Sequence, residues 1–128
     1  MSPSINGHIL VVEDDESYRR LVARMLGSAG YRVTTAGDFA EAMAVIEGAD
    51  PIDVLLTDVG MPPGTPHGVS IGSIARFKRP DLRLIYMSGG FDPTDFALYV
   101  ENSAVLRKPF TVATLIEAVR GAIGKDSK

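Results

Sequence analysis

ILVVED (residues 9–14) and VLLTD (residues 54–58) share one pattern, a short apolar run that ends in acidic residues. Apolar runs of this length predict strands that are buried on both faces, as in a parallel sheet. The carboxyl ends of neighbouring parallel strands lie at the same edge of the sheet. If the two strands are neighbours, the carboxylates of Glu13, Asp14 and Asp58 therefore converge at one edge.

Three converging carboxylates need a positive partner. Two like charges about 4 Å apart repel by roughly 4 kcal/mol at an effective dielectric of about 20. A hard divalent cation is the usual partner, and oxygen ligands suit Mg²⁺ or Mn²⁺ better than zinc. The sequence thus predicts a site for Mg²⁺, with Mn²⁺ as an alternative. The two histidines, His8 and His67, have no partner at metal-binding spacing, so we expect both to be solvated loop residues.

The composition is that of one globular domain without disulfides. The chain has 128 residues, of which 45% are hydrophobic and none is cysteine, so it can bury a core without covalent cross-links. No apolar run approaches the roughly 18 residues of a transmembrane helix. The N-terminus lacks the basic and apolar regions of a signal peptide. We therefore expect a cytoplasmic location without membrane contact.

The charge balance argues against direct binding to nucleic acid. Thirteen Lys and Arg residues against sixteen Asp and Glu residues give a net charge of −3. Proteins that bind nucleic acid through its phosphates usually carry a basic excess or a basic stripe. Because the sequence shows neither feature, we do not expect this chain itself to bind nucleic acid.

Strand-like and helix-like patterns alternate along the chain. Apolar residues at helical spacing run from Tyr18 to Leu26, and Gly30 is a typical C-terminal stop. Asp38 and Glu41 form a capping-box pattern at the start of the next helix. Strands are predicted at residues 9–12, 31–35, 52–58, 82–87 and 104–107. Helices are predicted around residues 18–26, 38–48, 69–77, 93–100 and 111–123.

Five strands separated by five helices predict an α/β fold, in which helices cover both faces of a parallel sheet. We expect a single domain over residues 8–124, with short flexible tails at residues 1–7 and 125–128. In open parallel sheets, ligands bind outside the carboxyl ends of the strands. The three acidic residues and Ser88 all lie at the ends of predicted strands. The predicted cation site therefore lies at the edge of the sheet where this fold binds ligands.

Four short motifs follow one another at these strand ends: Glu13-Asp14, Asp58-Val59-Gly60-Met61-Pro62, Ser88-Gly89 and Lys108-Pro109-Phe110. Together they resemble the receiver domain of two-component response regulators, the CheY-like family. The resemblance covers about residues 7–123. It implies a single-domain, flavodoxin-like (βα)5 three-layer sandwich, whose five-stranded parallel sheet has the order 2-1-3-4-5 that is typical of this family.

The resemblance assigns Asp58 as the phosphoacceptor, which takes a phosphoryl group from a histidine kinase or a histidine phosphotransfer protein. A carboxylate can attack phosphorus in line when nearby cations neutralise the charge of both groups. The resemblance also implies that Asp14, Asp58 and the backbone carbonyl of Gly60 bind Mg²⁺, while Glu13 acts through a water. Such a small set of carboxylates suits Mg²⁺, which keeps several of its waters.

Three further groups complete the implied site. Lys108 pairs with Asp58 and later with a phosphoryl oxygen, as a point charge. The Ser88 hydroxyl and the Gly89 amide donate to the phosphoryl group, and Pro109 resembles the cis-proline of the family. The signal leaves through the face formed by the last two helices and the last strand. We expect a signalling domain that catalyses only its own phosphorylation and dephosphorylation, and not an enzyme in the usual sense.

The chain departs from the family pattern at several positions. The loop between Pro62 and Gly68 is longer than usual. Val105 stands where many receivers have a Tyr or Phe that moves inward on phosphorylation. Gly60 and Gly90 occupy two positions whose side chains tune dephosphorylation in the family. This leads to the hypothesis that the phosphorylated chain loses its phosphoryl group slowly.

Two other classes of function stay open. The first is an interaction module that no longer uses phosphorylation. Val105 favours this module, whereas the intact motifs oppose it. Retained Mg²⁺ binding would distinguish a phosphoacceptor from such a module. The second is a Mg²⁺-dependent phosphohydrolase, which commonly has a second acid where this chain has Gly60. The sequence does not identify the cognate kinase, the output or the oligomeric state. It also leaves open whether the chain acts alone or belongs to a hybrid kinase or a larger regulator.

Overall fold

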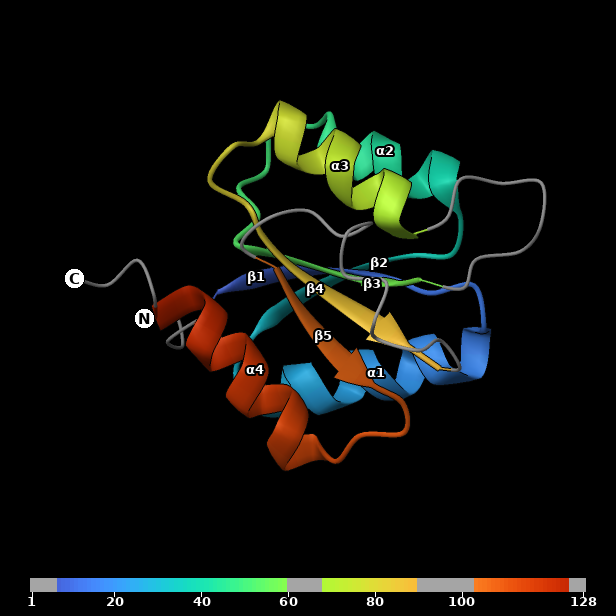
Figure 1. Cartoon of the computed structure of the whole chain (residues 1–128), viewed down its shortest axis with the longest axis vertical. Helices are drawn as coiled ribbons and strands as arrows, with labels where there is room; N and C mark the ends of the chain where they lie inside the picture. The colour runs from blue at the N-terminus through green and yellow to red at the C-terminus, as the bar shows by residue number, and fades with distance from the viewer. Residues whose placement is uncertain (1–6, 60–67, 90–102, 125–128) are drawn as a thin grey trace.

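The computed structural model describes residues 7–59, 68–89 and 103–124. Strands and helices alternate through the first four strands, as the sequence patterns predict (Figure 1). The strands are β1 (His8–Val12), β2 (Arg32–Ala36), β3 (Val54–Asp58), β4 (Arg83–Ser88) and β5 (Ser103–Arg107). The helices in the described ranges are α1 (Glu16–Ser28), α2 (Phe39–Ile46), α3 (Gly68–Lys78) and α4 (Val112–Gly124).

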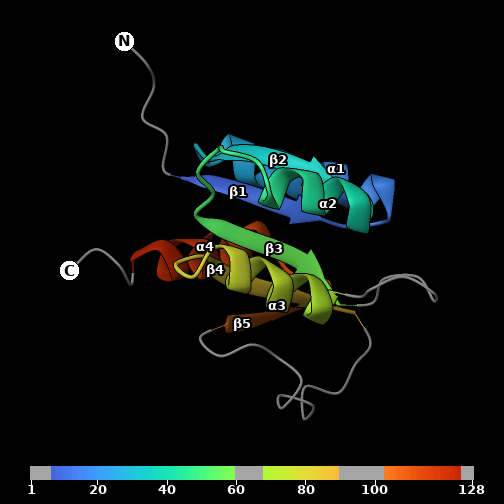
Figure 2. The ribbon, with the colours of Figure 1, turned by 90° about the horizontal axis from the view of Figure 1, so that it is seen from above.

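The five strands form one parallel sheet in the order β2-β1-β3-β4-β5 (Figure 2). β1 and β3 are therefore neighbours, with Leu10 opposite Leu55. Every residue of β1 and β3 is buried, whereas β2 and β5 form the two outer strands. Because all five strands run the same way, their carboxyl ends lie at one edge of the sheet, which we call the carboxyl edge.

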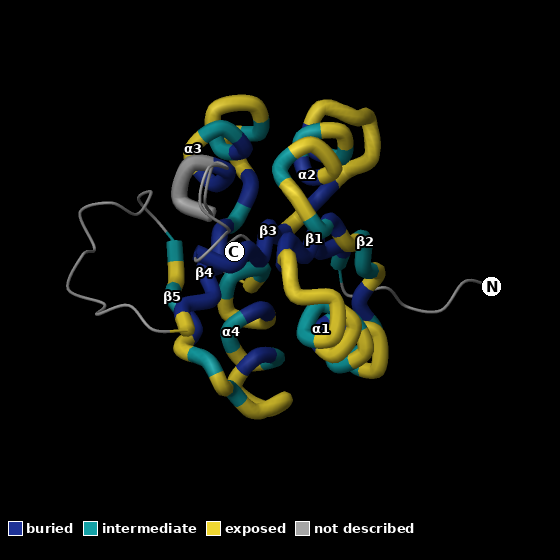
Figure 3. Tube along the Cα trace, turned by 90° about the vertical axis from the view of Figure 1, so that its right-hand side faces the viewer, coloured by how far each residue is buried: buried dark blue, intermediate teal, exposed yellow. Residues whose placement is uncertain are grey.

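Helices cover both faces of this sheet and make three layers (Figure 1). α2 and α3 lie on one face, and α1 and α4 lie on the other. Successive strand residues point to opposite faces: Leu10 and Leu55 join the core under α2 and α3, whereas Val11 and Leu56 join the core under α1 and α4. Figure 3 shows the buried strands at the centre, with exposed residues on the outer sides of the helices. Within the described ranges, no helix has the length and hydropathy to cross a membrane.

The predicted fold class is confirmed, since the chain forms a flavodoxin-like α/β sandwich with the strand order 2-1-3-4-5. The observed element bounds differ from the predicted ones by one or two residues. A strand ends where its ladder of hydrogen bonds ends, which need not be where its apolar run ends. The helix predicted at residues 93–100 lies outside the described residues, as do His67 and most of the two predicted tails.

His8 is not the solvated loop residue that the sequence predicts. It is the first residue of β1 and is 5% exposed. Its Nδ1 lies 2.7 Å from the Pro51 carbonyl oxygen, and its Nε2 lies 2.7 Å from the Thr34 hydroxyl. A carbonyl can only accept, so Nδ1–H donates to Pro51, and in the neutral ring Nε2 accepts from Thr34. These two partners allow the imidazole to be buried, at the opposite end of β1 from the predicted site.

Tyr86 fills the space between the sheet and α3. Its side chain is fully buried in β4, and its register partner on β5 is Val105. Gly72 of α3 makes room for the ring, because a Cβ at that position would overlap the Tyr86 hydroxyl and lie 3.0 Å from Cζ. The absence of a side chain at Gly72 is therefore what leaves room for the Tyr86 ring under this helix.

Replacing Gly72 by Ala should lower the free energy of unfolding by about 1–3 kcal/mol, because the new methyl group must displace the Tyr86 ring. Gly121 of α4 is the matched control, since nothing lies within 4 Å of a Cβ built there. Gly121→Ala should raise the free energy of unfolding by up to about 1 kcal/mol through helix propensity. Urea unfolding followed by circular dichroism measures both effects. A Gly72→Ala variant as stable as Gly121→Ala would contradict this packing.

Candidate functional site

Backbone hydrogen bonds continue past the carboxyl ends of the strands. The Glu13 amide donates to a carbonyl oxygen of β2 at 3.0 Å, and the Val59 amide donates to one of β4 at 2.9 Å. The Lys108 amide donates to the Ser88 carbonyl oxygen at 2.8 Å. The residues that follow β1, β3 and β5 are thus held by a neighbouring strand, so side chains at the carboxyl edge project from a rigid frame.

Glu13, Asp14 and Asp58 come together at the carboxyl edge, and we call them the acidic cluster. One carboxylate oxygen of each lies within 4.8 Å of the other two. Glu13 is 1% exposed and Asp58 is 5% exposed, whereas Asp14 faces solvent. Oxygen ligands lie about 2.1 Å from Mg²⁺, so opposite ligands of an octahedron are about 4.2 Å apart. Adjacent ligands are only about 3 Å apart, so the oxygens of the acidic cluster suit such an ion in kind, and those that bind it directly must move closer together.

The Lys108 ammonium lies among these carboxylates. Its Nζ is 2.8 Å from Glu13 Oε1 and 3.5 Å from Asp58 Oδ1. The sequence predicts a pair with Asp58, but the shorter contact is with Glu13. Glu13 has the longer side chain, and that side chain is less exposed, at 2% against 7% for Asp58. A buried charge gains most from a direct partner, so Lys108 lies between the two carboxylates and closer to Glu13.

Burial and charge act in opposite directions on this pair. Desolvation raises the pKa of Glu13, and the hydrogen bonds from Lys108 and from the Asp15 amide offset it only in part. Burial acts to lower the pKa of Lys108, but the Glu13 hydrogen bond and the Asp58 charge outweigh it, so the pKa of Lys108 is raised. Lys108 therefore stays protonated at neutral pH and provides a positive charge inside the acidic cluster.

Ser88 and Gly89 lie next to Lys108. Ser88 is the last residue of β4 and is 5% exposed. A Cβ built on Gly89 would lie 3.6 Å from Lys108 Cδ, so the Gly89 backbone borders the lysine side chain. The peptide bond between Lys108 and Pro109 is cis, as the family resemblance implies. Gly60, the predicted source of a backbone carbonyl ligand, lies outside the described residues.

Tyr18 also belongs to this site, although the sequence pattern assigns it only to the apolar stripe of the first helix. Its ring centroid lies 4.6 Å from Lys108 Nζ and 5.9 Å from the centroid of the Phe110 ring. Burial raises the pKa of the Tyr18 hydroxyl, against the charge of Lys108, so the phenol is neutral. Its position in the sequence could have indicated this, because Tyr18 lies about one helical turn after the acidic pair Glu13-Asp14.

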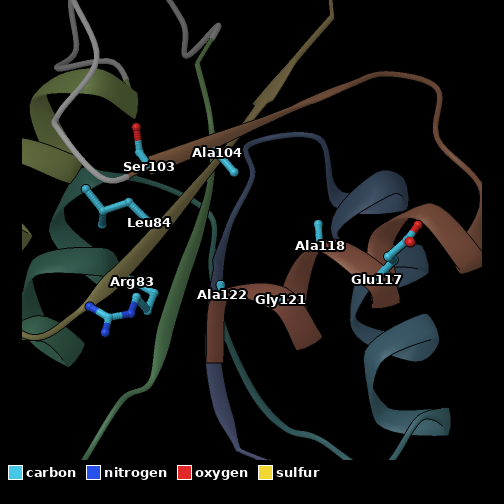
Figure 4. Close-up of a pocket in the computed structure, with 8 residues that line it drawn as sticks. All are labelled: Arg83, Leu84, Ser103, Ala104, Glu117, Ala118, Gly121 and Ala122. Carbon is cyan, nitrogen blue, oxygen red and sulfur yellow. The ribbon is translucent and has the colours of Figure 1, made fainter. Parts of the chain in front are cut away.

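A separate cavity of about 460 Å³ lies between α4 and the sheet (Figure 4). Arg83 and Ser103, the first residues of β4 and β5, line one side of it, and Glu117 and Gly121 of α4 line the other. These two strands thus meet the cavity at their amino ends. Since the acidic cluster lies at the carboxyl edge, this cavity is not part of the candidate site.

The sequence of this chain is similar to those of several known proteins. The family model described as the response regulator receiver domain matches residues 9–120. The response regulator receiver protein CpdR of Brucella abortus (strain 2308) is 31% identical over 115 residues, which cover 87% of this chain and 92% of CpdR. The transcription factor SKN7 of Candida albicans (strain SC5314 / ATCC MYA-2876) is 32% identical over 111 residues, which cover 85% of this chain and 19% of SKN7.

A solved structure has a fold similar to that of this chain. The crystal structure of a response regulator receiver protein from Sinorhizobium medicae WSM419 matches with a TM-score of 0.85 and 29% sequence identity. The match covers 92% of this chain and 94% of that one. The chain thus spans nearly all of some relatives and about a fifth of SKN7. On its sequence and its fold, the chain belongs to the response regulator receiver domains, the CheY-like signalling modules of two-component systems.

Proposed function

We propose that this chain takes a phosphoryl group from a histidine kinase or a histidine phosphotransfer protein onto Asp58, in a reaction that requires Mg²⁺. Receiver domains interact with such kinases and phosphotransfer proteins, and they generally bind Mg²⁺ at an acidic pocket. The observation that carries the proposal is the convergence of Glu13, Asp14 and Asp58 beside the Lys108 ammonium at the carboxyl edge.

Asp58 is the nucleophile in this proposal. One of its carboxylate oxygens forms a bond to phosphorus while the bond from phosphorus to the donor's imidazole nitrogen breaks, and that nitrogen keeps the electron pair. Lys108 Nζ, 3.5 Å from Asp58 Oδ1, offers its charge to the acceptor before transfer and to a phosphoryl oxygen afterwards. Partial burial strengthens this attraction, because less water is present to screen it.

Asp14 and Asp58 are the proposed direct ligands of Mg²⁺, with Gly60 as the backbone ligand. When bound, the ion supplies positive charge that offsets the repulsion between the acceptor carboxylate and the phosphoryl oxygens. Asp14 faces solvent, which leaves room for the waters that Mg²⁺ keeps. Glu13 is buried and already paired with Lys108. This division supports a role for Glu13 through a water and not as a direct ligand.

Ser88 and Gly89 are the proposed hydrogen-bond donors to the transferred phosphoryl group. β4 is the neighbour of β3, and the register pairs Asp58 with Met87. Ser88 therefore lies one residue further along the strand direction than the partner of the acceptor, and Gly89 follows it. This position at the carboxyl edge, with the Gly89 backbone beside the Lys108 side chain, supports the two proposed donors.

Two exposed apolar side chains support the approach of a protein donor. Leu21 lies one turn after Tyr18 on α1 and is 43% exposed, and Val112 opens α4 and is 48% exposed. The edge-to-face contact between Tyr18 and Phe110 joins these two parts of the chain beside the acidic cluster. A protein partner that carries a phosphohistidine would find these apolar side chains on the two helices next to the Tyr18–Phe110 contact.

The proposed output surface includes α4 and β5, together with the predicted helix at residues 93–100, which lies outside the described residues.

One observation favours the second candidate, an interaction module that does not use phosphorylation. Val105, the register partner of the fully buried Tyr86, has no ring that could move inward as the switch aromatic of many receivers does. The hypothesis of slow dephosphorylation rests on Gly60 and Gly90, which are also outside the described residues, and it stays a prediction.

Incubation of the full chain with Mg²⁺ and a small-molecule phosphodonor should add one phosphoryl group, because the acidic cluster offers both an acceptor and a cation site. Intact-mass spectrometry measures the adduct. Asp58→Asn is the matched control, and it should remain unmodified, as should the wild type in a chelator. An adduct on Asp58→Asn would move the acceptor to another residue. Absence of both the adduct and Mg²⁺ binding would favour the interaction module.

Lys108→Met should slow phosphorylation by the small donor about tenfold to a hundredfold, because a charged hydrogen bond worth about 1.5–3 kcal/mol is lost from the transition state. A time course of adduct formation at saturating Mg²⁺ measures the rate. Arg107→Met removes a neighbouring positive charge from an exposed position and should leave the rate near that of the wild type. An equal decrease in the phosphorylation rate of the two variants would show that only the net charge of the chain matters, and not the position of Lys108.

The contribution of Glu13 to the free energy of unfolding of the metal-free chain should fall as the pH rises from 4.5, its ordinary pKa, through the raised pKa of the folded chain. Folding raises this pKa, so in that window the unfolded chain has released a proton that the folded chain still binds. Urea unfolding in a chelator at a series of pH values measures the slope. Glu13→Gln should remove this component, whereas Glu16→Gln, at a side chain 62% exposed, should keep it. An unchanged slope in Glu13→Gln would contradict the burial of this charge.

A further inference from the structure

The Lys108 ammonium lies at the end of a flexible side chain that has several alternative partners. Glu13 and Asp58 attract it, at 2.8 Å and 3.5 Å from Nζ. The solvent-exposed carboxylate of Asp14 belongs to the same cluster. An ammonium is a compact point charge on a flexible stem, so carboxylates alone do not fix its position. A contact of another kind would restrict the ammonium further to the position between Glu13 and Asp58.

The ring of Tyr18 supplies such a contact. Lys108 Nζ lies 4.6 Å from the ring centroid, over the ring. The face of an aromatic ring is negative, and it attracts a cation within about 6 Å of the centroid. The attraction is stronger where water is displaced, and the Lys108 side chain is only 20% exposed. The ammonium therefore has a ring face as its third neighbour, in addition to the two carboxylates.

Two other contacts hold Tyr18, one at its backbone and one at its ring. Tyr18 lies in the first turn of α1, where its amide donates to the side chain of the N-cap residue Asp15 at 3.1 Å. The Phe110 ring meets it edge-on, with 5.9 Å between the centroids and 70° between the planes. Phe110 follows Lys108 by two residues. The same turn thus presents the ammonium and the ring that supports Tyr18.

We propose that Tyr18 is a positioning residue, whose ring holds the Lys108 ammonium between Glu13 and Asp58, where it can meet the phosphoryl group. The contact itself is a property of the metal-free chain. Its effect on phosphorylation rests on the proposed function. The experiment therefore has two readouts, one of which requires neither Mg²⁺ nor a phosphodonor.

The first readout is the proton spectrum of the full chain without metal. Ring currents move protons that lie over an aromatic face to higher field, so the ε-methylene protons of Lys108 should resonate upfield of their random-coil position. Lys108→Arg identifies this signal by removing it. Tyr18→Phe keeps the ring and should keep the shift, whereas Tyr18→Leu should abolish it.

The second readout is the rate of phosphorylation at saturating Mg²⁺ and small-molecule phosphodonor. Tyr18→Leu should react about three- to tenfold more slowly than the wild type, as expected for the loss of one cation–π contact. Its Mg²⁺ affinity should be unchanged, because Tyr18 offers no ligand atom to the acidic cluster. Tyr18→Phe should react near the wild-type rate. Arg20→Ala, at an exposed position of the same helix, should change neither readout.

Each outcome bears on the proposal. A random-coil position of the Lys108 ε-methylene signal in the wild type would overturn it, and this test does not depend on the folding of any variant. A Tyr18→Leu variant as fast as the wild type would also overturn it. Equal losses in Tyr18→Phe and Tyr18→Leu would assign the effect to the hydroxyl and overturn a role for the ring. An upfield signal in a wild type that accepts no phosphoryl group would support the contact and count against the proposed function.

Discussion

Three carboxylates meet at the carboxyl edge of the sheet, and the ammonium of Lys108 lies among them. The strand order creates this meeting, because it makes β1 and β3 neighbours and so brings the ends of both strands together. The positive charge comes from the turn after β5, 95 residues along the chain from Glu13. The cluster is therefore balanced only when the whole sheet has assembled, which couples the chemistry of the site to the completed fold.

Burial of the Glu13 charge is unfavourable, and the rest of the sheet offsets that cost. Burial raises the pKa of Glu13 even though Lys108 donates a hydrogen bond to it. Carboxylates with a perturbed pKa are typical of functional sites, where groups needed for the reaction are kept even though they lower stability. The apolar residues of β1, β3 and β4 are almost all buried, on both faces of the sheet. Their packing supplies the free energy that keeps such a cluster in a fixed frame.

Much of the fold and of the site was predictable from the sequence, because both depend on strong local patterns. Apolar runs followed by acids predicted the central strands, and the sheet brings those acids together. The position of Lys108 nearer to Glu13 than to Asp58 was not predictable, since it depends on how deeply each carboxylate is buried and on the contact with the Tyr18 ring. The burial of His8 was also missed, because its hydrogen-bond partners lie on other parts of the chain. Local patterns give strands and helices, whereas these contacts form only in three dimensions.

Calorimetric titration of Mg²⁺ into the metal-free, full-length chain tests most directly whether the acidic cluster is a divalent-cation site. We expect one ion to bind per chain. We also expect Asp14→Asn to lose most of this binding, because an exposed carboxylate ligand becomes a neutral amide of the same shape. Absence of binding to the wild type, or equal affinity in Asp14→Asn, would contradict the central claim that these carboxylates gather to hold a cation beside Asp58.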